Sequence, residues 1–168
     1  MGNVGVILIV GVSMLALQAG PALPSTTGTQ PAAEQSPAPG DVFPAFDAQA
    51  VNGGVQHVDF PKGSRTVLLF FLSSCSVCHK MIPEWNRAYQ RRPPTLKVFG
   101  VLLDQEPPGF FAVTPLAFPV LRAPSREFLQ ARKISRVPVT LRVGQGGKVE
   151  DVAVGIVDPI RLGEIFRP

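Results

Sequence analysis

The hydrophobic and polar positions of residues 41–168 follow two periods, and each period predicts one kind of element. Residues 66–72 and 96–103 are largely continuous apolar runs, which is typical of strands covered on both faces in a parallel or mixed sheet. Residues 79–91 place apolar side chains at helical spacing and therefore predict a helix with one buried face. A second helix is predicted to begin at Ser125, which is a suitable N-cap residue.

Turn and cap residues complete the predicted order of elements. An Asn-Gly-Gly turn divides residues 41–60 and predicts an N-terminal hairpin. Residues 139–143 and 148–155 read as two strands, and the glycine-rich segment between them predicts a tight connection. A final helix is predicted over residues 158–166, since an aspartate and a proline stand at its start.

The segment 106–119 is rich in aromatic and proline residues and predicts an irregular loop with a short helix. Within it, Phe110 and Phe111 are compatible either with an apolar lip for a partner or with a cover over the sheet. In chain order, strands and helices alternate first and a hairpin with a last helix follows. This order predicts an α/β fold with a mixed central sheet and helices on both faces.

The N-terminal part of the chain differs in composition from the rest. Residues 1–22 carry no charge, and the apolar run over residues 4–17 is shorter than the about 20 residues of a membrane span, so a signal peptide is favoured. No Lys or Arg precedes that run, which leaves an uncleaved membrane anchor as the alternative. Residues 23–40 are rich in Pro, Ala and Ser and predict a flexible linker. Residues 41–168 then form one domain of ordinary size.

Charge and cysteine content narrow the function. The net charge is +4, and Arg87, Arg91 and Arg92 lie close together, but no long basic run with interleaved aromatic residues follows. These arginines therefore predict a solvated surface, and no nucleic-acid partner is expected. Two cysteines are too few for a disulfide scaffold, and their spacing favours a redox pair in an oxidising compartment.

The two cysteines form the motif Cys75-Ser76-Val77-Cys78 between a predicted strand and a predicted helix. At the start of that helix, Cys75 would face unpaired N–H groups and the positive end of the helix dipole, which favour a nucleophilic thiolate. His79 and Lys80 add possible positive charge and a possible proton-transfer group. Cys78 would lie one turn inside the helix, more buried, where it could resolve a mixed disulfide.

Other functions of the same motif are less well supported. Cys-x-x-Cys-His is also the attachment signature of c-type haem, but Met81 is the only methionine downstream, and it lies too close to serve as a distal ligand. A zinc site would need two further ligands, and only His57 and His79 are available. A purely structural disulfide is the remaining alternative. No metal and no bound cofactor is therefore expected.

Several segments together resemble a known family. These segments are Phe70-Phe71-Leu72-Ser73-Ser74-Cys75-Ser76-Val77-Cys78, Lys80-Met81-Ile82-Pro83, Phe118-Pro119-Val120-Leu121 and Val137-Pro138-Val139-Thr140. They resemble exported thioredoxin-fold proteins of the TlpA/ResA type and are similar to its MauD-like branch. The resemblance implies a thioredoxin-like three-layer fold with an N-terminal β-hairpin extension. It also implies a helix-kinking role for Pro83, a cis peptide bond at Pro138 opposite the cysteines, and docking of an extended substrate peptide along the Val137 backbone.

The sequence departs from the family pattern at three positions. Ser74 replaces the usual Trp before the first cysteine, Leu69 replaces a buried Asp, and Met81 replaces a Glu. The resemblance assigns both missing carboxylates to proton transfer at the buried cysteine. Their absence favours a specialised, oxidising or slow exchanger over a fast general reductase. A peroxidase is not indicated, because no Pro-x-x-x-Thr/Ser-x-x-Cys run is present.

These observations predict an exported, monomeric thiol–disulfide oxidoreductase that is periplasmic or otherwise extracytoplasmic and either released or tethered to the inner membrane. Its partners would be protein clients carrying thiols or disulfides and an upstream redox protein. Cys75 and Cys78 would be catalytic, and Val137 and Pro138 would bind substrate. The alternatives are an oxidase or isomerase in place of a reductase, a binding or chaperone module without turnover, and a c-type haem carrier.

Overall fold

The computed structural model describes residues 1–2 and 36–167. The predicted signal peptide or anchor, residues 1–22, and most of the predicted linker lie outside these described residues apart from the first two positions. In the described part of the chain, no helix has both the length and the apolar character needed to cross a membrane.

A five-stranded mixed sheet forms the centre of the domain, with the strand order β5-β4-β3-β6-β7. Its strands are β3 (Arg65–Phe71), β4 (Leu96–Leu102), β5 (Val120–Arg122), β6 (Val139–Val143) and β7 (Val149–Val154). β3 pairs in parallel with β4 and antiparallel with β6, while β4 pairs in parallel with β5. Every β3 residue after Arg65 is buried, as the continuous apolar run predicts.

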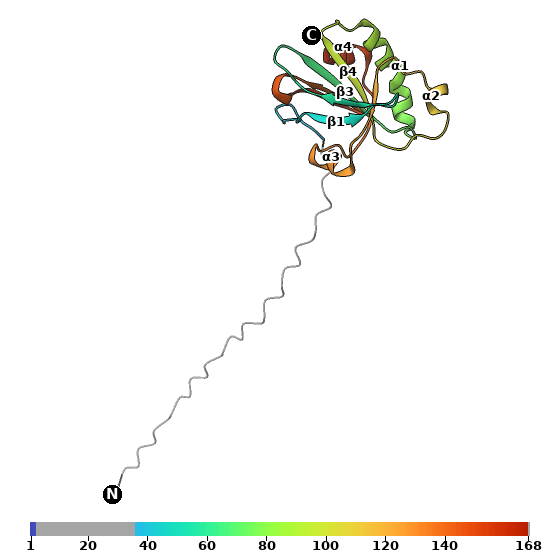
Figure 1. Ribbon diagram of the computed structural model, residues 1–168. Coiled ribbons are helices and arrows are strands. Elements are labelled where there is room, and N and C mark those ends of the chain that lie inside the picture. Colours follow the sequence, from blue (N-terminus) through green and yellow to red (C-terminus); the bar gives the residue numbers. More distant parts are fainter. Residues whose placement is uncertain (3–35, 168) are drawn as a thin grey trace. The chain divides into compact units, whose positions relative to one another are not determined.

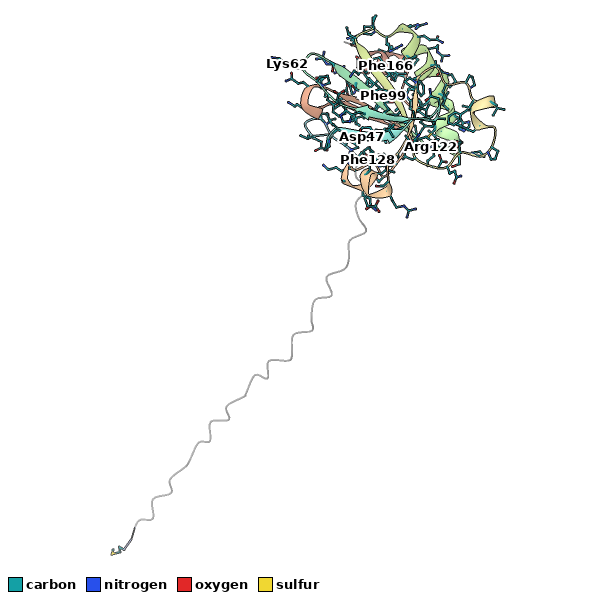
Figure 2. All side chains as sticks on the ribbon, viewed as in Figure 1. Asp47, Lys62, Phe99, Arg122, Phe128 and Phe166 are labelled. Atoms are coloured by element: carbon teal, nitrogen blue, oxygen red, sulfur yellow. The ribbon has the colours of Figure 1, made fainter. Side chains whose placement is uncertain are left out.

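Two layers cover the sheet, one on each face (Figure 1). Helices α1 (Ser76–Arg91) and α4 (Pro159–Ile165) pack on one face around Trp85. The hairpin β1 (Phe46–Gln49) and β2 (Val55–Val58) packs on the other face with α3 (Arg126–Ala131). Figure 2 labels Phe166, which belongs to the cluster beneath α1 and α4, and Phe128, which belongs to the cluster beneath the hairpin.

The alternation of side chains along β3 explains how both layers are held. Val67, Leu69 and Phe71 join the cluster beneath α1 and α4, whereas Leu68 and Phe70 join the cluster beneath the hairpin. Because both faces of this strand are covered by apolar residues, the sheet has two separate cores. The predicted α/β fold, with a mixed central sheet, three layers and an N-terminal hairpin, is confirmed.

The capping residues show why the helices begin where they do. Ser125 accepts a hydrogen bond from the Phe128 N–H at 3.1 Å, and Asp158 accepts from the N–H groups of Ile160 and Arg161, as predicted. Helix α1 begins at Ser76, earlier than the predicted residue 79, and continues through Pro83. The earlier start places Cys75 at the N-cap and Cys78 inside the first turn.

Two short elements complete the chain. The predicted short helix of the aromatic segment is α2 (Phe110–Val113), and a 3₁₀ turn, η1 (Gln145–Gly147), lies between β6 and β7. Strand β5 was not predicted, because three residues carry no measurable period. It follows the aromatic segment and forms the edge of the sheet beside β4.

Candidate active site

Cys75 lies where strand β3 has ended and helix α1 begins. It is the N-cap residue of α1, and its Sγ accepts a hydrogen bond from the Cys78 backbone N–H at 3.1 Å. The side chain is half-buried, so its sulfur remains accessible to a partner. An N–H donor at the positive end of a helix stabilises a thiolate, which is the reactive form in disulfide exchange.

Cys78 has the opposite environment, although it lies in the same helical turn. It is fully buried and belongs to the apolar cluster between the sheet and α1. Burial is the largest cause that raises the pKa of the Cys78 thiol, to about 12, and a hydrogen bond with Cys75 adds to the rise. At neutral pH Cys78 is therefore a protonated thiol, while both cysteines are free in the structure.

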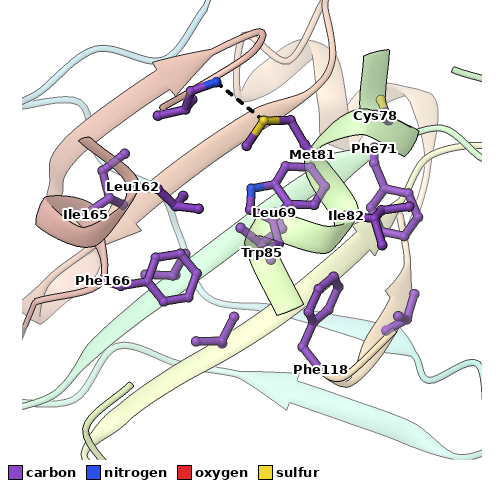
Figure 3. Close-up of a cluster of buried hydrophobic side chains, with 14 of the residues drawn as sticks. Leu69, Phe71, Cys78, Met81, Ile82, Trp85, Phe118, Leu162, Ile165 and Phe166 are labelled. Carbon is purple, nitrogen blue, oxygen red and sulfur yellow. Dashed lines mark hydrogen bonds between the residues drawn. The ribbon is translucent and has the colours of Figure 1, made fainter. Parts of the chain in front are cut away.

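The apolar cluster around Cys78 includes Leu69 and Met81, the two positions where the sequence resemblance implies carboxylates (Figure 3). Leu69 is fully buried in β3, and Met81 is buried on α1, where its Sδ accepts a hydrogen bond from the Val157 N–H at 3.4 Å. The members of this cluster are apolar, and the buried polar residues of the described chain are Thr66, Ser73 and Thr140, so no buried carboxylate is available there to take a proton from Cys78. The departures seen in the sequence thus coincide with an apolar surrounding for the buried thiol.

Asp104 organises the loop before Cys75, and sequence reasoning did not select it. Its carboxylate accepts from the Ser73 N–H at 2.8 Å and the Ser73 hydroxyl at 2.9 Å. It also accepts from the Ser74 N–H at 3.4 Å and the Ser74 hydroxyl at 3.3 Å. These four hydrogen bonds to one carboxylate hold the two residues that directly precede Cys75.

A sequence signal for Asp104 did exist. It follows β4, which pairs in parallel with β3, and the carboxyl ends of adjacent parallel strands lie at the same edge of a sheet. A polar residue just after β4 must therefore lie near the loop that follows β3. The two serines, at positions 73 and 74, supply the matching donors.

His79 fastens the same loop from the helix side. The nitrogen Nε2 lies 2.7 Å from the Ser73 carbonyl oxygen, so this nitrogen carries the proton and donates it. The ring also packs edge-on against Phe110 with centroids 5.9 Å apart. His79 therefore connects the start of α1 both to the loop before Cys75 and to helix α2. Its predicted share in proton transfer stays a prediction.

The loop before β6 completes the site. The Val137–Pro138 peptide bond is cis, as the family resemblance implies. Cys75 and Val137 line one groove of about 330 Å³, whose remaining walls are Leu72, Leu103, Ile134, Ser135 and Arg136. The Pro138 carbonyl accepts from the Gly155 N–H at 2.8 Å, whereas the Val137 backbone makes no hydrogen bond to another described residue. The structure thus brings together the first cysteine and the predicted substrate-binding loop.

The remaining predicted residues lie elsewhere. Lys80 is exposed on α1, and its electrostatic role stays a prediction. His57 lies on β2, where it contacts Asp47 at 2.6 Å. In the described part of the chain, no cluster of His, Cys, Asp or Glu side chains has the arrangement of a metal site. Phe110 is buried and Phe111 half-buried, so both contribute to the cover of the sheet.

Comparison with known proteins agrees with this geometry. The sporulation thiol-disulfide oxidoreductase A of Bacillus subtilis (strain 168) is 26% identical over 145 residues, which cover 82% of this chain and 85% of that protein. The crystal structure of StoA from Bacillus subtilis superposes with a TM-score of 0.64 at 22% identity, covering 74% of this chain and 98% of the other.

Two further solved structures share the fold. A protein from Chlorobium tepidum, described as the thiol:disulfide interchange protein DsbE, has 25% identity and a TM-score of 0.62 over 75% of this chain and 92% of its own. A disulfide oxidoreductase of Mycobacterium tuberculosis, described as secreted, has 16% identity and a TM-score of 0.60 over 72% and 93%.

The fold, the dithiol that caps a helix and these relatives define a thioredoxin-like thiol–disulfide oxidoreductase, as predicted from the sequence. Residues 39–152 match the AhpC/TSA family, and the chain belongs to that family. The matched region contains the hairpin, both cysteines and the Val137–Pro138 loop.

Proposed function

We propose that this protein is exported and exchanges disulfides with protein clients through Cys75 and Cys78. The observation that supports it most is that the accessible Cys75 and the Val137 loop line one groove, with Cys78 buried directly behind. An accessible first thiol and a shielded second thiol suit a reaction in which a client is held covalently only for a short time.

In the reducing direction, the Cys75 thiolate attacks one sulfur of a client disulfide. The Cys75–client disulfide forms, and the other client sulfur leaves as a thiolate and takes up a proton. Cys78 then gives up its proton to solvent and attacks the Cys75 sulfur, so that a Cys75–Cys78 disulfide forms and the second client sulfur leaves as a thiolate and takes up a proton. Two electrons pass from the protein to the client, and the oxidising direction is the exact reverse.

The groove supports a client that binds as an extended chain. Leu72, Leu103 and Ile134 give it apolar walls, and the Val137 backbone leaves its hydrogen-bonding groups available among the described residues. An extended peptide can pair with such a backbone segment as an added strand, which would bring a client cysteine close to Cys75. Val137 and Pro138 are therefore proposed to bind substrate.

Export is proposed from the N-terminal sequence. Residues 1–22 have the apolar character of a signal peptide or an anchor, and residues 23–40 have the composition of a spacer. The secreted oxidoreductase of Mycobacterium tuberculosis shares the fold, which is consistent with this proposal. The client proteins and the upstream redox partner lie outside the cytoplasm on this hypothesis, where disulfides persist.

The test compares the wild-type protein with Cys75→Ser and Cys78→Ser in an insulin-reduction assay. Both variants should lose turnover, because neither can complete the cycle. After incubation with a disulfide-bonded client, only Cys78→Ser should accumulate a mixed disulfide, visible by mass spectrometry without reductant. Turnover by Cys75→Ser at the wild-type rate would refute the proposal, as would capture of clients by Cys75→Ser alone, which would indicate a binding module.

A second measurement decides the direction of electron flow. Equilibration of the dithiol with glutathione redox buffers gives its reduction potential, and a tenfold change in the equilibrium constant corresponds to about 30 mV for a two-electron couple. A potential close to that of a strong oxidant would assign the protein as an oxidase, and a much lower one as a reductase.

A further inference from the structure

A cleft lies at the end of α1 that is farthest from the dithiol. The helix has 16 residues, so it is roughly 24 Å long at 1.5 Å per residue. The cleft has a volume of about 470 Å³ and lies between the last turns of α1 and helix α4, which pack together. In space, α4 and the last turn of α1 lie beside the C-terminus of the domain (Figure 1).

Arginine side chains surround this cleft. The sequence suggests only a solvated surface at Arg87, Arg91 and Arg92, but the fold adds Arg167 from beyond α4. Glu84 is the single acidic residue in the lining, and it is paired with Arg87. The remaining three guanidinium groups therefore give the cleft a net positive charge.

Two of these guanidinium groups have no partner within the described chain. No hydrogen bond or ion pair with another described residue involves the side chains of Arg91 or Arg167. Arg92 is held in place, since its guanidinium stacks 3.6 Å from the centre of the Tyr89 ring and donates to the Tyr89 carbonyl. Its Nε is nevertheless buried without a hydrogen-bond partner in the described part of the molecule.

The floor of the cleft is apolar. Its side chains are Ala88, Pro93, Pro159, Leu162 and Phe166. Gly163 of α4 also lines it, and a Cβ built there would have no heavy atom within 4 Å, so the space above this glycine is open. A concave volume of this size with an apolar floor and a few polar groups has the character of a small-molecule site.

We propose that this cleft binds a small organic anion. Its apolar body would lie on the floor beside Leu162 and Phe166, and its carboxylate, sulfonate or phosphate group would accept hydrogen bonds from Arg91 and Arg167. Guanidinium groups suit this role, because their planar N–H groups match the oxygens of such anions in pairs. The site is independent of disulfide exchange, since none of its residues lines the groove at Cys75.

The probe for this site is 8-anilinonaphthalene-1-sulfonate, which combines an aromatic body with one sulfonate and fluoresces when bound. The full-length protein is titrated with it, and the double variant Arg91→Ser/Arg167→Ser is compared with wild type. We expect the double variant to bind the probe at least about tenfold more weakly, because each hydrogen bond from a charged guanidinium group to the sulfonate contributes to the binding free energy. Lys62→Ser/Arg126→Ser removes the same charge from exposed positions outside the cleft and should change the affinity less than about twofold.

A second variant blocks the floor and leaves every arginine in place. Gly163→Leu extends into the open space and replaces a helical glycine by a better helix former, so the protein should fold at least as stably as wild type. It should also bind the probe at least about tenfold more weakly. N-phenyl-1-naphthylamine, which has the same body without the sulfonate, should bind the wild type at least about tenfold more weakly than the sulfonate.

Each result decides the proposal. Loss of probe binding in both the arginine variant and Gly163→Leu, with the surface control unchanged, supports it. Equal binding by wild type and Arg91→Ser/Arg167→Ser would overturn it, because the probe would then bind elsewhere, for example at apolar residues outside the cleft. Equal affinity for the neutral analogue would also overturn it. Insulin reduction does not enter these outcomes, so failure here leaves the proposed function untouched.

Discussion

The loop that precedes α1 and the cluster beneath its first turn present opposite environments to two cysteines in a single helical turn. On the loop side, Asp104 accepts four hydrogen bonds from Ser73 and Ser74, and Cys75 is half-buried beside an open groove. On the cluster side, Cys78 is fully buried among apolar side chains, and its pKa is raised by that burial. Hydrogen bonds therefore position the first thiol, and exclusion of water keeps the second one protonated.

This difference separates two requirements of disulfide exchange. The position of Cys75 determines which client sulfur it can reach, and the loop that carries it is held by a carboxylate from a neighbouring strand. The reactivity of Cys78 depends on where its proton can go, and the described cluster offers no carboxylate to accept it. Changing each side separately should therefore affect different steps.

The largest expected effect concerns the buried thiol and pH. In the unfolded chain a thiol with the ordinary pKa of 9.0 loses its proton above that pH, whereas folded Cys78 keeps its proton up to about pH 12. The contribution of the protonated Cys78 thiol to the free energy of unfolding is therefore fully present below about pH 9. As the pH rises from about 9 to 12, the free energy of unfolding of the reduced protein should fall. The loss should reach a few kcal/mol, at about 1.4 kcal/mol for each unit of pKa difference.

Urea unfolding at a series of pH values, with reductant present, measures this effect. Cys78→Ala provides the control, because it removes the titrating thiol and leaves the other alkaline groups in place. The difference between the two proteins should change steadily across the window. Parallel curves would show that Cys78 is not shielded as the structure indicates.

A smaller effect is expected when a carboxylate is introduced into the apolar cluster around Cys78. Met81→Glu places one in the cluster that contains Cys78, where it can accept the thiol proton. General-base assistance typically contributes more than hundredfold, but a buried glutamate is itself costly to ionise, so we expect a tenfold to hundredfold faster attack of Cys78 on the mixed disulfide. Rapid-quench analysis of a Cys75-linked model peptide gives this rate.

Met81→Gln is the matched control for that change. It has nearly the same shape and can still accept the Val157 N–H, but it cannot take a proton. Both variants should unfold at lower urea concentration than wild type, because each buries a polar group in place of an apolar one. If Glu and Gln give the same rate, proton acceptance at this position does not limit resolution.

The smallest expected effect concerns the hydrogen bonds between Asp104 and the loop before Cys75. Asp104→Asn keeps the shape of the side chain but replaces one accepting oxygen by an N–H₂ donor, which cannot serve the serine N–H and hydroxyl donors in the same way. We expect a loss of about 1–2 kcal/mol in the free energy of unfolding and a several-fold slower insulin reduction.

A double-mutant cycle with Ser73→Ala isolates the contact. If Asp104 acts through Ser73, the two substitutions together should cost less than the sum of their separate effects. Additive effects would mean that the carboxylate contributes in another way. Asp47→Asn, at an exposed position of β1, should leave insulin reduction unchanged and serves as the surface control.

Much of the fold could be predicted because its signals are local. The continuous apolar run before the cysteines predicts β3, the spacing of Met81, Ile82 and Trp85 predicts the buried face of α1, and Asp158 marks the start of α4. Strand β5 escaped prediction, since its three residues obtain their conformation from pairing with β4. The site residues that carry a motif, Cys75 and Cys78, were predicted for the same local reason.

The sequence by itself determined the order of the elements other than β5, the pair of thiols at a helix start, and the apolar residues Leu69 and Met81 where the resemblance implies carboxylates. Only the tertiary structure placed Asp104 on Ser73, a residue 31 positions earlier, and Val137 in one groove with Cys75. It also joined Arg167 to the arginines of α1. These contacts depend on which strands pair and which helices pack. Because the contacting residues lie far apart in the sequence, they produce no local hydrophobic pattern from which the contact could be predicted.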